Sequence, residues 1–349
     1  MVPFVDLSRR GARFSDQFTA RAAQIAVSGQ FLLGPELEAF EAEFGSFLGA
    51  GHVVGLSSGA SALQLALKAA GVSAGDDVLV PAFTAVPTAS AVVAMGARPV
   101  LVDVDPATAC ITEQTVAAAR TPLTTAVIVV HLYGYPIEEL PSTDLIVIED
   151  AAQATGALRD PGRSAATAYS FYPTKNLGGI CDGGAIVTSD TSLAKQARQL
   201  RVHGMTEQYV HVEISQNFRM SELAAAWLRL GLDELAADNA ARRRIARDCR
   251  SAAPQLCWQQ DHDDHVFHLN VFRTRERQRV RETLTAAGIG SAVHYPIPIT
   301  QQPAFIDARH APCPEAGAWA EQCVSIPCFP EMTNDEVNRV CSALASLTA

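Results

Sequence analysis

The sequence is short of positive charge for a protein that would bind nucleic acid or an anionic membrane. It has 27 lysines and arginines against 37 aspartates and glutamates, a formal net charge of −10 over 349 residues. Such a balance repels phosphate backbones and anionic lipids. The main basic run, Arg242–Arg244, lies in an alanine-rich helical pattern, so we interpret it as a solvated helix face. We expect no nucleic-acid partner, no membrane partner and a cytoplasmic location.

Two further absences narrow the class of protein. The 8 cysteines include no C-x-x-C pair, so neither a zinc ribbon nor a disulfide framework is indicated, and free thiols are expected. The uncharged stretch 78–97 has the length of a membrane span but is interrupted by Pro81, Pro87 and Gly96. The first 14 residues contain no apolar run of signal-peptide type.

The chain also lacks internal repeats, and after residue 50 it alternates short apolar runs with helical stretches. Runs that predict strands are 52–58, 77–81, 99–105, 125–134, 145–153, 167–173 and 184–190. Continuous apolar strands separated by helices predict an α/β fold with a mostly parallel central sheet covered by helices on both faces.

The last third has a different pattern. A helix over 221–249 is long enough to bridge two domains, and it is followed by a predicted strand (265–273), a helix ending at Gly288 and a short strand that runs into a turn (292–298). We predict a large domain over 1–230, including the N-terminal segment, and a smaller α+β domain over 231–349 that carries the bridging helix.

Three features stand at the predicted strand ends, where ligands bind in such sheets. Asp150 ends an apolar strand, Lys175 lies in a crowded loop, and Ser57–Ala60 joins a strand to a helix. Each has an ordinary explanation: a helix cap, an ion pair, a serine N-cap. Together they fit pyridoxal 5′-phosphate (PLP), because its aldehyde, ring nitrogen and phosphate would find an amine, a carboxylate and a helix N-terminus. The junction is neither G-x-G-x-x-G nor a P-loop.

Blocks spread over nearly the whole chain carry a family resemblance. They are VVHLYGYP (129–136), IEDAAQATGA (148–157), SFYPTKNLGGICDGGAIVTSD (170–190), QNFRMSELAAA (216–226), VHYPIPITQQPAF (293–305) and SIPCFPEMTNDEV (325–337). The sequence resembles the DegT/DnrJ/EryC1/StrS family of PLP-dependent sugar aminotransferases, within the fold-type I PLP transferases.

The resemblance implies roles for matched positions. Lys175 would be the Schiff-base lysine and proton shuttle, Asp150 would meet the pyridine nitrogen, and Gln153 would lie at the phenolic oxygen of the ring. Phosphate contacts are implied for Ser58, Gly59 and Ser170. Asn217 would reach the phosphate of a neighbouring subunit, which implies a homodimer with a shared active site. Arg219 is a candidate for that interface or for a donor carboxylate, or it forms a salt bridge to Glu222.

Several positions depart from the family pattern. Ala85 stands where an aromatic residue often stacks on the cofactor ring; Phe83 either takes that place or is a core residue. Thr155 stands where the family often has histidine, and residues 165–167 replace a Gly-Asp pair. Thr300 replaces a family histidine near the substrate, so no particular sugar is carried over. The candidates for the acceptor pocket are His294, Tyr295 and Thr300, each with ordinary strand packing as the alternative.

The implied activity is transfer of an amino group from L-glutamate or L-glutamine to a keto-sugar nucleotide, with pyridoxamine phosphate formed in the first half. The alternatives are an aminotransferase for a cyclitol ketone, a PLP-dependent sugar dehydratase, which would replace Lys175 by histidine, and a non-catalytic PLP sensor, which would normally carry an added domain. Residues Asp261–His268 hold clustered carboxylates and imidazoles, but HVFHL alternates like a strand, so we predict no metal site.

Overall fold

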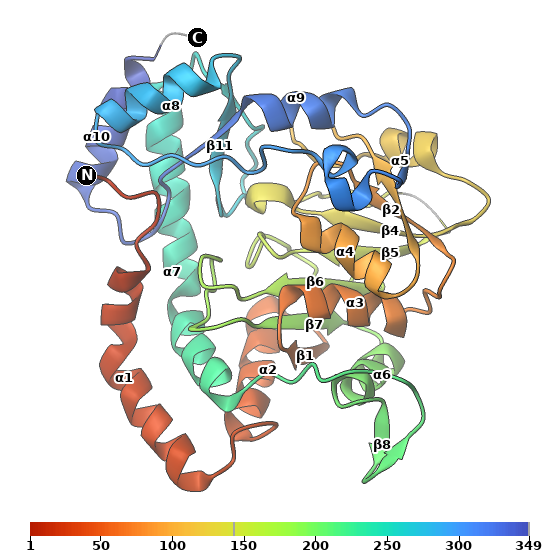
Figure 1. The fold of residues 1–349 in the computed structure, drawn as a ribbon. Coiled ribbons are helices and arrows are strands. Elements are labelled where there is room, and N and C mark those ends of the chain that lie inside the picture. The colour runs from red at the N-terminus through yellow and green to blue at the C-terminus, as the bar shows by residue number, and fades with distance from the viewer. Residues whose placement is uncertain (142–143, 348–349) are drawn as a thin grey trace.

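The computed structural model describes residues 1–141 and 144–347, and its centre is a mostly parallel sheet (Figure 1). The strand order is β1-β7-β6-β5-β4-β2-β3-β12. Every neighbouring pair is parallel except β1–β7 and β7–β6. The strands are β1 (His52–Leu56), β2 (Asp77–Pro81), β3 (Arg98–Val102), β4 (Thr124–Val130), β5 (Ile146–Asp150), β6 (Ala166–Ser170), β7 (Gly184–Thr188) and β12 (Arg309–His310). The prediction of a mostly parallel α/β sheet is confirmed.

Helices cover both faces of this sheet, as shown by successive strand residues that pack into two different cores. Ile186 of β7 joins the core that contains the α3 side chains, whereas Ala185 and Val187 join the core that contains those of α2 and α7. One layer holds α3 (Gly59–Ala69), α4 (Val86–Ala94) and α6 (Thr191–Arg201); the other holds α2 (Pro35–Leu48) and the 31-residue α7 (Glu222–Ala252). Figure 1 shows α1 (Leu7–Ser28) lying along α7.

The C-terminal part forms a second, smaller core. A three-stranded antiparallel sheet, β10-β11-β13, packs with α8 (Arg277–Ala286) and α10 (Asn334–Ala345). Its strands are β10 (Cys257–Trp258), β11 (Asn270–Arg273) and β13 (Cys323–Ile326). The remaining elements are α5 (Glu113–Ala119), α9 (Pro314–Gln322), the hairpin β8 (Met205–Glu207) and β9 (Val210–His211), and the 3-10 turns η1 (Leu132–Gly134), η2 (Ile299–Gln301) and η3 (Pro303–Phe305).

The domain division stays a prediction. The boundary between residues 230 and 231 falls inside α7, which contributes side chains to both cores. Val2 belongs to the small core, and β12 pairs with β3 in the large sheet, so each predicted domain contributes a segment to the other.

Three local predictions were wrong. The strand predicted over 265–273 is regular only from Asn270. The short strand predicted at the start of 292–298 is a single bridge between Ala292 and Ser325. Arg242, interpreted as part of a solvated face, is 2% exposed, whereas Arg244 is exposed.

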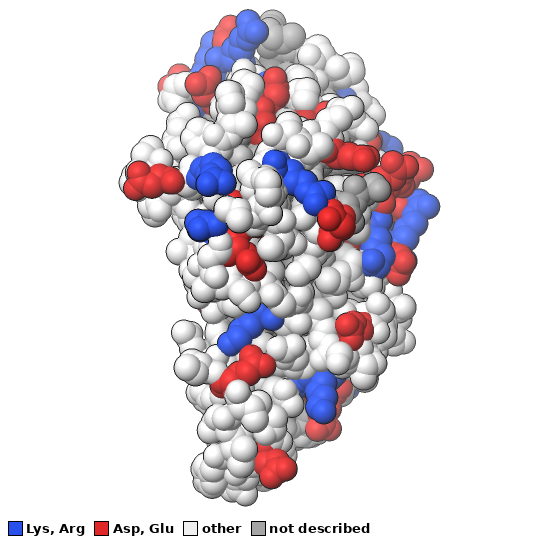
Figure 2. Space-filling view, turned by 90° about the vertical axis from the view of Figure 1, so that its right-hand side faces the viewer, with Lys and Arg blue, Asp and Glu red and all other residues white. Residues whose placement is uncertain are grey.

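The surface mixes charges of both signs. Figure 2 shows acidic and basic side chains interspersed over one face of the molecule. Among the described residues, no helix combines the length and apolar character needed to cross a bilayer.

Candidate active site

The sequence-predicted residues converge at the edge of the sheet where β5 and β6 end and α3 begins. A cavity of about 270 Å³ lies there. Six of the predicted site residues line it: Ser58, Gly59, Asp150, Gln153, Ser170 and Lys175. Their convergence follows from topology, because β5 and β6 are parallel neighbours and β1, two strands away, runs in the same direction.

One end of the cavity is a narrow cradle at the start of α3. Ser58 is the N-cap of this helix, and its hydroxyl accepts a hydrogen bond from Ser61 N at 3.1 Å. A Cβ at Gly59 would lie 2.6 Å from Ser170 Cβ, so only glycine allows the helix to approach β6 this closely. Likewise a Cβ at Gly184 would lie 2.3 Å from the carbonyl oxygen of Ser58. The two glycines bring the amide groups of the helix start and the Ser170 hydroxyl to one place, which suits an anion.

Asp150 is a buried carboxylate with two donors. Asp150 as a residue is only 4% exposed. Thr88 Oγ1 donates to Oδ2 at 2.9 Å, and Ala152 N donates to Oδ1 at 3.0 Å. Burial raises the pKa of Asp150 above its usual value, while these two hydrogen bonds and the charge of Lys175 oppose the rise. Thr88 was missed by the sequence analysis.

Lys175 lies where this cavity meets a second one of about 410 Å³. Burial lowers the pKa of its amine to about 8, and the negative charge of Asp150 acts in the opposite direction. Two hydrogen bonds hold the loop that carries it: Arg10 of α1 donates to the Lys175 carbonyl at 3.2 Å, and the Asn176 amide donates to Asn239 Oδ1 at 2.7 Å. The backbone is therefore fixed while the amine faces the cavities.

Gln153 is oriented by two tyrosines from other segments. Tyr133 N donates to Gln153 Oε1 at 2.7 Å, and Gln153 Nε2 donates to Tyr295 Oη at 3.0 Å. Tyr295 thus connects the first cavity to the second, which it lines together with His294. Two of the three acceptor-pocket candidates therefore lie next to Lys175.

The remaining predicted residues lie outside both cavities. Thr300 is in η2 and does not line either one. Asn217 is exposed, and its Oδ1 accepts from Arg219 Nε at 2.8 Å. The alternative bridge from Arg219 to Glu222 is not formed within the described residues; Glu222 is buried and accepts backbone hydrogen bonds from Gly34, Glu36 and Leu37.

Phe83 is a core residue in this structure. It is 1% exposed, its ring stacks on Trp319 with centroids 6.0 Å apart, and it does not line the cavity. Ala85 lines the cavity instead. The ring-stacking role considered for Phe83 therefore finds no support in its position.

The segment 261–268 gathers possible metal ligands without forming a dedicated site. Ligand atoms of Glu138, His262 and Asp264 lie within 4.8 Å of one another. Glu138 already pairs with His262 at 2.9 Å, and Asp264 pairs with Arg159 at 2.5 Å. We assign no metal to these residues.

The donor set fits PLP. A glycine cradle with a serine hydroxyl suits a phosphate, and a buried carboxylate and a lysine with a lowered pKa line the same cavity. When bound, this cofactor supplies an aldehyde that exchanges amino groups and a ring that accepts electron density.

Comparisons with known proteins agree with this geometry. Residues 13–345 match the model of the DegT/DnrJ/EryC1/StrS aminotransferase family. The chain is 39% identical to dTDP-3-amino-3,4,6-trideoxy-alpha-D-glucose transaminase of Streptomyces venezuelae, over 98% of this chain and 95% of that one. It is 38% identical to UDP-N-acetyl-3-dehydro-alpha-D-glucosamine 3-aminotransferase of Acidithiobacillus ferrooxidans, over 98% and 97%.

Solved structures give the same result. DesV of S. venezuelae, crystallised with a ketimine intermediate, superposes with a TM-score of 0.93 at 37% identity, covering 99% of this chain and 97% of that one. NtdA of Bacillus subtilis, with the cofactor PMP bound, superposes with a TM-score of 0.90 at 29% identity, covering 98% and 84%.

Fold and site together define a PLP-dependent aminotransferase of fold type I. More specifically, the chain belongs to the DegT/DnrJ/EryC1/StrS aminotransferase family.

Proposed function

We propose that this enzyme transfers an amino group from L-glutamate or L-glutamine to the ketone of a nucleotide-linked sugar. The observation that carries the proposal is the shared cavity of Lys175 and Asp150, with the phosphate cradle of Ser58, Gly59 and Ser170 at one end. The names of the two relatives above both refer to an amino group at sugar carbon 3, one on a dTDP sugar and one on a UDP sugar. We therefore propose a 3-keto sugar nucleotide as the acceptor, with a cyclitol ketone as the alternative.

Asp150 would hold a proton on the pyridine nitrogen. Its carboxylate is fixed by Thr88 and the Ala152 amide, so both oxygens keep one orientation. A negative charge held at the ring nitrogen keeps that nitrogen protonated and increases the electron demand of the ring.

Lys175 would first bond the cofactor aldehyde and then, as a free amine, carry a proton to and from the reacting carbon of the substrate. A pKa of about 8 leaves a useful fraction of the amine unprotonated near neutral pH. Lys175 lines both cavities, which suits both tasks, because the cofactor would be held in the smaller cavity and the substrates would be bound in the larger one.

The assembly belongs to the same proposal. Asn217 is exposed, its Oδ1 accepts a hydrogen bond from Arg219 Nε at 2.8 Å, and it lines neither cavity of its own chain. A contact between Asn217 and a cofactor phosphate would therefore need a second copy of the chain. We propose a homodimer in which Asn217 completes the cofactor site of the neighbouring subunit, in a cytoplasmic enzyme.

The test begins with the covalent bond. The chain has three lysines, Lys68, Lys175 and Lys195. Borohydride reduction of the PLP-loaded protein followed by peptide mass analysis is expected to label Lys175. Lys175→Ala should remove the label and the amino transfer, whereas Lys195→Ala, at an exposed position on α6, should change neither. A label on another lysine, or full turnover by Lys175→Ala, would overturn the assignment.

The substrate is tested with a panel. Wild-type protein is incubated with glutamate or glutamine and dTDP- or UDP-linked 3-keto sugars, their 4-keto isomers, or scyllo-inosose. Amination of the 3-keto sugars in preference to the others supports the proposal; preference for the inosose makes the enzyme a cyclitol aminotransferase. A sensor would release no 2-oxo acid with any acceptor.

A further inference from the structure

The second cavity contains a buried arginine that the proposed chemistry has not used. This space of about 410 Å³ is lined by Lys175, Tyr172, Arg242, His268 and His294, among other residues. No aspartate or glutamate is among the described residues that line it. Arg242 comes from the middle of α7, and it belongs to the run that the sequence suggested was solvated.

Arg242 has incomplete polar contacts. Its Nη1 donates to the carbonyl oxygens of Phe267, at 3.4 Å, and Cys328. Its Nε is buried and has no hydrogen-bond partner. Among the described residues no carboxylate comes within 4.0 Å of this guanidinium. A buried charge without a counter-ion is costly, so the position calls for an anion that the folded chain does not itself supply.

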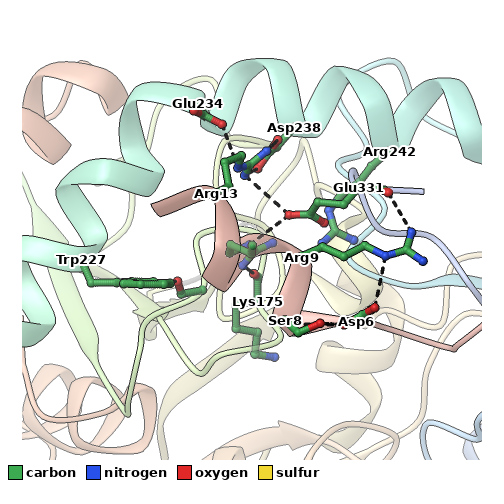
Figure 3. Close-up of polar contacts among 12 residues, drawn as sticks. Asp6, Ser8, Arg9, Arg13, Lys175, Trp227, Glu234, Asp238, Arg242 and Glu331 are labelled. Carbon is green, nitrogen blue, oxygen red and sulfur yellow. Dashed lines mark hydrogen bonds and ion pairs between the residues drawn. The ribbon is translucent and has the colours of Figure 1, made fainter. Parts of the chain in front are cut away.

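The nearest acidic groups are already engaged by other arginines. Glu331 lies 3.5 Å from Arg10 and 3.6 Å from Arg13, and Asp238 lies 2.9 Å from Arg13. Figure 3 shows this group of ion pairs between α1 and α7, with Arg242 beside it and Lys175 below. The charges of Glu331 and Asp238 raise the pKa of Arg242 from a distance, but neither carboxylate forms an ion pair with it among the described residues.

The other ionisable groups facing the cavity do not replace this charge. Burial lowers the pKa of His268 well below its usual range and that of His294 to about 4, so both rings are neutral near pH 7. Burial also lowers the pKa of Arg242, to about 10, which leaves it fully charged at that pH. Arg219, the sequence candidate for a donor carboxylate, does not line this space within one chain.

We propose that Arg242 binds a carboxylate of the amino-acid donor in this cavity. The proposal rests on the aminotransferase function above and names its donor subsite. The walls provided by Phe4, Val5 and Phe329 are apolar and suit the methylene chain of glutamate or glutamine. Arg242 and Lys175 line the same cavity. An amino-acid donor can therefore bind Arg242 through a carboxylate while its amino-bearing carbon lies at the Lys175 amine.

The experiment compares Arg242→Lys and Arg242→Met with Arg250→Met. Arg250 is a matched control because it lies two turns further along α7, is partly buried, and donates to the Gln259 carbonyl without lining the cavity. Binding of glutarate, a dicarboxylate that cannot transfer an amino group, is measured by calorimetry on the PLP-loaded protein. Steady-state KM for glutamate and glutamine is measured in parallel, and thermal unfolding checks that each variant is folded.

A lost charged hydrogen bond should weaken glutarate binding roughly 10- to 100-fold in Arg242→Met, with partial recovery in Arg242→Lys. The same variants should raise the KM for the donor while the KM for the acceptor stays near its wild-type value. If the KM rises for both glutamate and glutamine, Arg242 binds the α-carboxylate of the donor. If the KM rises for glutamate alone, Arg242 binds the side-chain carboxylate, which glutamine lacks. Arg250→Met should show neither change.

Two results separate this inference from the proposed function. If folded Arg242→Met binds glutarate and uses donor as the wild type does, the inference is wrong and the aminotransferase assignment stands. If wild-type protein transfers no amino group but binds glutarate through Arg242, the carboxylate site stands and the function is wrong.

Discussion

Gly59→Ala is the substitution whose effect the structure predicts most directly. The added methyl carbon would lie 2.6 Å from Ser170 Cβ, 2.9 Å from Ser170 Oγ and 3.2 Å from the α-carbon of Ser170. Carbon atoms that touch prefer a separation of about 3.5–4.0 Å, so the overlap is close to an ångström. Ser170 cannot move freely, because it pairs with Gly184 at the start of β7.

Overpacking of this kind costs about 1–3 kcal/mol. The strain falls on the junction that forms the phosphate cradle, so we expect loss of both stability and cofactor affinity. Strain that the cofactor-free protein relieves by displacing the cradle must be restored on binding, so at 1.4 kcal/mol for each factor of ten PLP should bind up to roughly 150-fold more weakly.

The assay is a double-mutant cycle with Ser170→Gly, which removes the two closest atoms, Cβ and Oγ, and leaves only the backbone carbon at 3.2 Å. PLP binding is followed by absorbance titration and unfolding by urea. The cost of Gly59→Ala should fall by about 1 kcal/mol or more in the Ser170→Gly background. Gly317→Ala in α9 is the control, because its Cβ would meet nothing within 4 Å.

The reasoning is refuted if Gly59→Ala binds PLP with wild-type affinity. It is also refuted if its cost is unchanged when Ser170 is glycine, because the steric overlap with that side chain would then not be the cause.

Two further predictions concern the acid and the amine. Thr88→Val keeps the shape of the side chain but removes the hydrogen-bond donor to Asp150 Oδ2, so the pKa of Asp150 should rise further. The acid limb of the kcat/KM profile should then move to higher pH, with activity reduced roughly tenfold. Thr88→Ser should restore the profile, and coincident profiles for the valine variant and the wild type would contradict the role of this hydrogen bond. Capture of PLP by cofactor-free enzyme, measured by stopped flow, should accelerate as pH rises through about 8 and then level off, since only the unprotonated Lys175 amine reacts. Asp150→Asn removes the charge that raises the pKa of Lys175, so this midpoint should move to lower pH; a midpoint that stays or rises would show that the two groups are not coupled in this way.

The core of the site was predictable because each of its main residues stands in a short sequence pattern that can be recognised without the rest of the chain. Asp150 ends an apolar strand, Lys175 lies in a loop after a later strand, and Ser58 stands at a strand-to-helix junction, so the rule that parallel strands present their carboxyl ends at one edge was enough to bring them together. The short strand predicted at the start of 292–298 is reduced to a single bridge, although His294 and Tyr295 still line the second cavity.

The interpretation of Arg242 failed although a periodic signal was present. Leu235, Asp238, Asn239, Arg242, Ile245 and Cys249 are buried and recur at short helical intervals, which marks one face of α7. Arginine and aspartate on that face look polar in a hydrophobicity pattern, so the composition of the run obscured its position. Burial of charged side chains depends on partners that lie far away in sequence, such as the Cys328 carbonyl.

By itself the sequence determined the class of fold, the strand ends that carry chemistry, and the family motifs, because each is written in residues close together along the chain. Only the tertiary structure decided that Thr88 holds Asp150, that Gly184 admits the Ser58 carbonyl, and that Arg242 faces a cavity rather than water. These relations join segments dozens of residues apart, and they follow from how helices pack against the sheet rather than from any local preference.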